Sequence, residues 1–197
     1  GMALILLSPL FLVLALVVML DTPGAIFFVQ KRVGREKRYF SMLKFRTMLK
    51  DTPRDIPTHE MDHPERWITA SGRFLRRTSL DELPQLINVF LGQMSLVGPR
   101  PALWNQEDLV LERDKYTGRR GMTANAVRPG LTGWAQINGR DELSIEDKAR
   151  FDGEYVQKFG FLMDLKCLLG TVAYVLRHEG VVEGGTGKLK QESKGKP

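Results

Sequence analysis

Two adjacent carboxylic acids, Asp81 and Glu82, are the side chains in this sequence best suited to do chemistry. Two arginines precede them and an apolar run follows. Ser79 and Glu82 have the spacing of a capping box, which predicts a helix that starts here, although Pro84 favours a kink or a later start. A helix N-terminus and neighbouring guanidinium groups both stabilise the charged form of an acid, so we expect Asp81 to be an anion at neutral pH.

An anionic, well-positioned carboxylate can act in two ways. It can be a nucleophile towards phosphorus, or it can bind a hard cation. The simpler interpretation is a capped helix start with an acid pair on the surface. For the dipeptide alone we prefer that interpretation, because such acids are common near a helix N-terminus.

Two segments downstream favour the chemical interpretation. Residues 92–101 and 127–140 are rich in glycine, proline, arginine and amide side chains, and they show little apolar periodicity. This composition is typical of rigid loops, whose backbone N–H groups and forked guanidinium groups suit phosphate oxygens. The sequence therefore predicts a phosphate site that these loops share with the acid pair.

Taken together, these segments resemble a known family, the monotopic phosphoglycosyl transferases, which are also called bacterial sugar transferases. The matching blocks are residues 27–34, 44–48, 79–85, 94–101 and 127–140. They cover most of the chain between residues 8 and 183, in the order of the family. Five separate blocks in order make the resemblance highly specific, which no single block would be.

The resemblance implies a two-step transfer of a phosphosugar from a nucleotide sugar, expected to be a UDP-sugar, to a polyprenol phosphate. It assigns Asp81 as the nucleophile that forms a covalent aspartyl-phosphosugar intermediate, and Glu82 as a support for metal or proton handling. Mg²⁺ is the expected cofactor, with Asp81 and Glu82 as its protein ligands, because it prefers carboxylate and phosphate oxygens. The reaction would initiate a bacterial glycoconjugate pathway such as exopolysaccharide biosynthesis.

Matching the family's motifs residue by residue also gives candidates for binding the substrate phosphates. These are Lys44, Arg76, Arg100, Arg128 and Arg140. Asp152 is a further candidate, for the polar network around them. Each arginine could instead form a salt bridge that staples a loop, and we expect this of at least one of the four.

Length, net charge and cysteine content limit the kinds of fold and partner that this chain can have. With 197 residues, 43% of them hydrophobic, the chain is long enough for one globular core. The net charge of +6 suits an anionic partner, whether nucleic acid, anionic lipid or a phosphorylated substrate. Cys167 is the single cysteine, which excludes an intramolecular disulfide, and its apolar surroundings in the sequence predict a buried structural role.

The N-terminal residues 3–20 carry no charge, and Ser8 and Pro9 are their only polar or helix-breaking members. These 18 residues would extend about 27 Å as a helix, only just enough to span a bilayer core. Pro9 predicts a kink near Ser8. A transmembrane anchor, a cleaved signal peptide and a bent segment that turns back all fit this pattern. A signal peptide is disfavoured because no basic residue precedes the apolar run.

Basic residues between positions 31 and 38 follow the run, so we expect the next domain on the cytoplasmic side. The resemblance selects the re-entrant form, a helix broken at Ser8–Pro9 that returns to the cytoplasmic face of the bacterial inner membrane and contacts membrane lipid. The family has a longer basic lead-in than the seven residues before Ser8, so we expect this membrane arm to be truncated at its N-terminus.

The expected fold class is α+β, mostly helical with one β-hairpin. Strands are predicted at 26–32 and 38–45, and helices at 67–77, 103–116, 143–159 and 161–177. The expected division is a membrane helix at 1–22, a cytoplasmic catalytic domain at 23–183 and a flexible basic tail at 184–197.

Three other functions stay open. Charge alone would fit a membrane-anchored nucleic-acid-binding protein, but no helix-turn-helix or aromatic stacking platform is recognisable, so we expect no nucleic-acid partner. A catalytically silent scaffold for polysaccharide assembly would not need the intact Asp81–Glu82 pair. One-step transfer with a carboxylate as general base is the third. A homo-oligomer also stays open.

Overall fold

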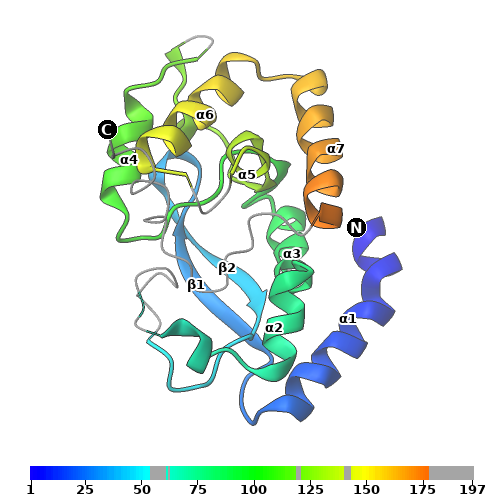
Figure 1. The fold of residues 1–197 in the computed structure, drawn as a ribbon. Coiled ribbons are helices and arrows are strands. Elements are labelled where there is room, and N and C mark those ends of the chain that lie inside the picture. Colours follow the sequence, from blue (N-terminus) through cyan, green and yellow to red (C-terminus); the bar gives the residue numbers. More distant parts are fainter. Residues whose placement is uncertain (54–60, 62, 119–120, 140–142, 178–197) are drawn as a thin grey trace, which may run out of the picture.

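A computed structural model describes residues 1–53, 61, 63–118, 121–139 and 143–177, and these are mostly helical with small β-sheets. The largest sheet is an antiparallel hairpin of β1 (Phe27–Val33) and β2 (Tyr39–Phe45), in which the first residue of each strand lies opposite the last of the other. The hairpin lies at the centre of the fold (Figure 1). The predicted α+β class and the predicted hairpin are therefore confirmed, with boundaries shifted by one residue.

A second sheet lies where the sequence predicted loops alone. β3 (Ser95–Val97) and β4 (Gly130–Thr132) form a parallel pair. The glycines of these segments allow the close approach of two backbones, because a Cβ atom at Gly130 would overlap the backbone of Gly98. Glycine here serves strand packing, which local composition does not distinguish from loop flexibility.

The helices confirm the predicted helical stretches, each of which contains an observed one. They are α2 (Ala70–Arg77), α4 (Glu107–Asp114), α6 (Ile145–Gln157) and α7 (Phe161–Arg177), together with the shorter α3 (Gln85–Phe90) and α5 (Trp134–Ile137). α6 packs against α4 and α5, and α7 packs against α5. One buried cluster joins β3 to α6 and α7 through Val97, Val156 and Cys167. Cys167 is fully buried as predicted, and burial raises the pKa of its thiol to about 11.

The N-terminal helix α1 (Met2–Asp21) continues through Pro9. Proline has no N–H for the carbonyl of Ile5, and the Ser8 hydroxyl donates a hydrogen bond to that carbonyl at 2.7 Å. The Ser8–Pro9 pair therefore supplies a replacement donor, and the hydrogen-bonded helix does not end there. A re-entrant path through a membrane stays a prediction.

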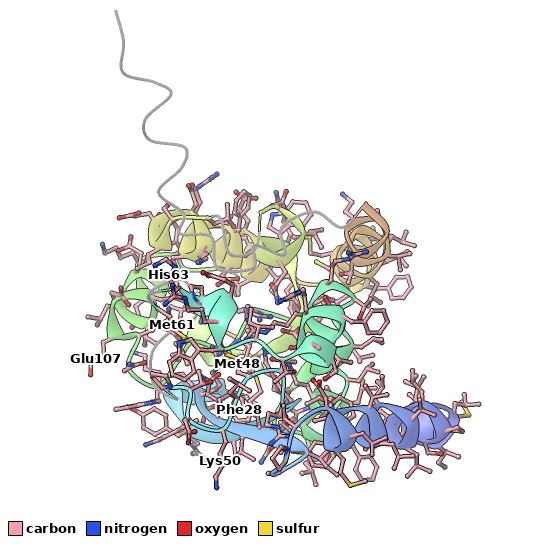
Figure 2. The ribbon with its side chains drawn as sticks, turned by 60° about the horizontal axis from the view of Figure 1, so that its bottom comes forward. Phe28, Met48, Lys50, Met61, His63 and Glu107 are labelled. Carbon is pink, nitrogen blue, oxygen red and sulfur yellow. The ribbon has the colours of Figure 1, made fainter. Side chains whose placement is uncertain are left out.

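Most of α1 has no protein to pack against. It extends from one side of the molecule, and many of its side chains are directed into open space (Figure 2). Ile5 and Leu20 are 75% and 80% exposed, and only 11% of the apolar window of this helix is buried. It is long and apolar enough to cross a membrane. Because a core helix would be mostly buried, this exposure favours a membrane-associated helix.

The domain boundary predicted at residues 22–23 stays a prediction, although α1 does contact α2. The predicted basic tail, residues 184–197, lies outside the described residues.

Helix α2 rests directly on the backbone that follows β2. The Thr69 side chain caps it by accepting a hydrogen bond from the N–H of Gly72 at 3.0 Å, and the Thr69 N–H donates to the carbonyl of Thr47 at 3.0 Å. A Cβ atom at Gly72 would overlap that same Thr47 carbonyl. Only glycine at this position lets the helix pack so closely.

We therefore expect Gly72→Ala to destabilise the fold by about 2 kcal/mol, because forced overpacking outweighs the gain of about 1 kcal/mol in helix propensity. Urea unfolding in detergent measures the change. The control Arg73→Ala lies on the exposed side of the same helix and should stay within about 0.5 kcal/mol of the parent. A Gly72→Ala protein as stable as the parent would contradict this packing.

Candidate active site

Asp81 and Glu82 lie on a tight 3₁₀ turn, Leu80–Glu82, between α2 and α3. Ser79 adopts a left-handed conformation with φ 55°, and its side chain does not cap the turn. The predicted capping box is therefore wrong, because a capping serine needs an extended backbone. The α-helix begins later, after Pro84, which is the alternative that the proline favoured.

The turn presents different chemistry on its two sides. Leu80 and Leu83, which flank the acids, pack against the cluster that contains Leu14 of α1. Asp81 and Glu82 are themselves buried, at 8% and 7% exposure. Buried carboxylates need compensating partners, so the acids must face polar or cationic groups.

For Glu82 those groups are two cations from distant segments. Its Oε1 atom accepts hydrogen bonds from Lys44 Nζ and from an Arg100 Nη2 atom, each at 2.9 Å. Lys44 comes from β2, and Arg100 follows β3. The structure thus brings three of the predicted site residues into direct contact. Glu82 thus holds two cations next to a second carboxylate, Asp81. The phosphates of a bound substrate could replace Glu82 as the partner of these cations.

The pKa of Lys44 reflects the same cluster of charges. Burial lowers the pKa of its ammonium group, and the nearby Arg100 and Arg32 guanidinium groups lower it further. Glu82 and, less strongly, Asp81 act in the opposite direction. The acid pair therefore favours the charged form of Lys44, against the effect of burial and of the two arginines.

Arg32 and Arg113 are basic residues at the site that the sequence analysis missed. Arg32 donates a hydrogen bond to the carbonyl of Pro101 at 3.0 Å, next to Arg100. Its position in the matching block 27–34 was the available signal. Arg113 lies on α4, within the helical stretch predicted at residues 103–116, and it is buried.

Arg113 connects Asp152 to the site. Its Nε and Nη2 atoms donate to Asp152 Oδ2 at 2.8 and 2.6 Å, and Nη2 also donates to the carbonyl of Arg100 at 2.8 Å. Burial raises the pKa of Asp152, and the Arg113 guanidinium opposes that rise. Asp152 does not touch Arg100 in these hydrogen bonds but holds Arg113, and Arg113 holds the carbonyl of Arg100. The pair therefore supports the backbone from which the Arg100 side chain reaches Glu82.

The remaining predicted arginines lie in different surroundings. Arg76 Nε donates to Thr47 Oγ1 at 2.9 Å and so ties α2 to the segment that follows β2. Arg128 is exposed, and its carbonyl lies against Gly98, two residues before Arg100. Arg140 lies outside the described residues. Among the predicted cations, Lys44 and Arg100 are therefore two that contact the acid pair, both at Glu82.

A metal ion at this site would need ligands from the substrate. Within the described ranges, no three metal-binding side chains come together. Asp81 and Glu82 supply adjacent carboxylates, which is a fitting donor set for Mg²⁺, since this ion is commonly held by one or two carboxylates plus substrate phosphates. Their role as metal ligands stays a prediction.

Comparison with known proteins settles the family. The family model described as bacterial sugar transferase matches residues 1–178, which is most of the chain. The chain belongs to the bacterial sugar transferase family.

Three relatives illustrate this sugar transferase's place in the family. The uncharacterized sugar transferase EpsL of Bacillus subtilis is 44% identical over 84% of this chain and 77% of its own. The exopolysaccharide production protein ExoY of Sinorhizobium fredii is 37% identical over 91% and 82%. The UDP-glucose:undecaprenyl-phosphate glucose-1-phosphate transferase of Escherichia coli is 41% identical over 86% of this chain, which spans 36% of that longer protein. The family and these names indicate a sugar-phosphate transferase enzyme.

The charge balance of this sugar transferase can be tested at Lys44. Since Glu82 raises the pKa of Lys44, we expect Glu82→Gln to lower that pKa further. NMR titration of the labelled lysine side chains measures the shift, with Lys44→Arg to assign the resonance. The matched control Glu112→Gln removes an acid that contacts exposed Lys115, so it should shift Lys115 and leave Lys44 in place. An unchanged or higher Lys44 pKa in Glu82→Gln would rule out the arrangement described.

Proposed function

We propose that this enzyme transfers a phosphosugar from a UDP-sugar to a polyprenol phosphate at the cytoplasmic face of the membrane, through a covalent intermediate on Asp81. The observation that carries the proposal is the position of the acid turn. It packs on the apolar helix α1 through Leu80 and Leu83, while Glu82 holds Lys44 and Arg100. A site for anionic phosphates therefore adjoins a helix suited to a membrane.

In the first step, a carboxylate oxygen of Asp81 attacks the phosphorus that carries the sugar. A new bond forms between that phosphorus and the carboxylate oxygen, and the bond from the phosphorus to the bridging oxygen of the diphosphate breaks. Uridine monophosphate leaves with the electron pair of the broken bond. The product on the protein is an acyl phosphate that carries the sugar, which makes Asp81 a nucleophilic catalyst.

In the second step, a phosphate oxygen of the polyprenol phosphate attacks the same phosphorus. The bond from the phosphorus to Asp81 breaks, the carboxylate is restored, and the product is a polyprenol diphosphate sugar. Two successive displacements split one difficult transfer between two substrates into easier reactions. The name of the Escherichia coli relative, a glucose-1-phosphate transferase that acts on undecaprenyl phosphate, supports this donor and acceptor chemistry.

Lys44 and Arg100 bind and orient the donor in this proposal. Both already point at Glu82 Oε1, so the diphosphate oxygens would meet cations whose positions are fixed in advance. The guanidinium fork of Arg100 can bind two phosphate oxygens at once, whereas Lys44 offers a compact charge. Mg²⁺ held by Asp81, Glu82 and the diphosphate would supply neutralisation of negative charge at the reacting phosphorus.

The membrane location suits the acceptor. A long-chain polyprenol phosphate keeps its head group at the bilayer surface, where an enzyme held by α1 would meet it by diffusion in two dimensions. The net charge of +6 favours both an anionic leaflet and the acceptor phosphate. The ExoY relative, named for exopolysaccharide production, supports a role at the start of such a pathway.

The covalent step has a direct test. We expect incubation with UDP-sugar and Mg²⁺, without acceptor, to add the mass of one sugar phosphate to the intact protein and to release one uridine monophosphate per enzyme. Asp81→Asn should show no adduct and lose activity by about a thousandfold or more, because it removes the nucleophile. Asp147→Asn changes a half-exposed acid on α6, so it is the matched control and should keep the adduct.

Two outcomes would contradict the proposal. Formation of the lipid product at full rate with no adduct in rapidly quenched samples would favour one-step transfer with a carboxylate as general base. Strong, salt-sensitive binding to a DNA duplex without any sugar transfer would instead favour a nucleic-acid-binding protein.

A further inference from the structure

The C-terminal end of α1 is held by a buried arginine outside the cation site. Arg46 Nη1 donates to the carbonyl of Pro23 at 2.8 Å, and Nη2 donates to those of Thr22 and Val18 at 2.5 and 3.4 Å. The last carbonyls of a helix have no partner within the helix, so a guanidinium group here both satisfies them and complements the helix dipole. Arg46 is only 8% exposed, so this contact is part of the packed interior.

A second polar contact ties the same end of α1 to α2. Asp21 Oδ2 accepts hydrogen bonds from the backbone N–H and the hydroxyl of Ser71, at 2.9 and 2.6 Å. These hydrogen bonds lower the pKa of Asp21, so its carboxylate is charged beside the N-terminal turn of α2. The connection that follows α1 passes Gly24 at φ 130°, where a Cβ atom would overlap the Arg46 guanidinium. The chain can make this turn against Arg46 only with glycine.

The end of β2 links this joint to the catalytic turn. Lys44 binds Glu82, the next residue Phe45 packs against α1, and Arg46 caps α1. The rings of Phe45 and Phe11 are 5.8 Å apart. Three consecutive residues thus connect the acid pair to the apolar helix, so the depth of α1 in a membrane fixes the depth of the acids.

We propose that this joint, formed by Asp21 with Ser71 and by Arg46 with the end of α1, sets the height of the Asp81 turn at the bilayer surface and is required for transfer to a membrane-bound acceptor. The inference rests on the function proposed above. Asp21 and Arg46 act through α1 and are positioning residues, because their side-chain hydrogen bonds go to the end of α1 and to α2.

The physical reason is a difference in freedom between the two substrates. A soluble nucleotide sugar can follow the catalytic turn wherever it lies, whereas the phosphate of a long-chain lipid stays at the depth of the head groups. Reacting atoms must approach to about 3–3.5 Å, and a misplacement of about 1 Å can cost a hundredfold in rate. An error in height therefore penalises the lipid acceptor alone.

The activity test compares two acceptors on enzyme in the same anionic nanodiscs. One is a long-chain polyprenol phosphate in the bilayer, and the other is a short-chain, water-soluble prenyl phosphate. We expect Asp21→Asn and Arg46→Gln to lower kcat/KM for the bilayer acceptor by about tenfold or more. For the soluble acceptor, and for the KM of the donor, the change should stay within about twofold. An equal fall with both acceptors, or no fall with either, would overturn the proposal.

Asp147→Asn is the matched control, because Asp147 also accepts a serine hydroxyl hydrogen bond near a helix N-terminus, at 3.1 Å from Ser144 Oγ. It lies on α6, away from the joint, so both acceptors should react at the parent rate. If Asp147→Asn reproduced the loss with the bilayer acceptor, the joint would have no special role.

A depth measurement tests the joint without any turnover. A nitroxide attached at Arg73→Cys, an exposed position on α2, reports its immersion by power-saturation EPR in nanodiscs. Cys167 is fully buried and should stay unlabelled. We expect Asp21→Asn and Arg46→Gln to shift or broaden the depth of the label, and Asp147→Asn to leave it unchanged.

An unchanged depth in the joint variants would overturn the proposal, whatever the activity. If the parent enzyme transferred sugar to neither acceptor, the proposed function would fail, and the label would still decide whether the joint sets the depth. The two failures are therefore distinguishable.

Discussion

A single carboxylate oxygen, Oε1 of Glu82, is the point on which the site depends. It accepts hydrogen bonds from both Lys44 and Arg100, and all three side chains are largely removed from water. Two cations brought together in such a place would repel each other and would each lose hydration. The shared acid makes their proximity tolerable, and it holds both cations at the residue next to Asp81, where the phosphates of a donor would need them.

The contact of Glu82 with Lys44 and Arg100 is supported by neighbouring residues on two sides. Behind Arg100, the buried Arg113–Asp152 pair holds the carbonyl of residue 100. On the other side, the end of β2 places Lys44 on the acid and the following residues on α1. The acid turn is thus fixed between a polar layer and an apolar helix. Packed interiors transmit small displacements, so each layer constrains the geometry of the cations.

The motif blocks and the hydrophobic patterns of the sequence predicted much of this arrangement. Alternation around a short polar turn predicted the hairpin, and the resemblance to the sugar transferase family implied that Asp81, Glu82, Lys44 and Arg100 share one site. Arg113 was missed because one arginine in a charged helix has no local pattern that separates it from a solvated residue. The β3–β4 pair was missed because strands of three residues are too short to show periodicity. Ser79 was misassigned because its spacing to Glu82 fits a capping box, whereas its backbone is left-handed and its side chain does not cap the turn.

The most direct test of the central claim is the position of the donor on the protein. A structure of Asp81→Asn with an intact UDP-sugar and Mg²⁺ in nanodiscs would show where the reacting phosphorus lies. We expect the phosphorus that carries the sugar to lie about 3–3.5 Å from the side-chain oxygen of residue 81, with Lys44 and Arg100 on the diphosphate oxygens. A donor bound with that phosphorus out of reach of residue 81, or away from both cations, would contradict the account.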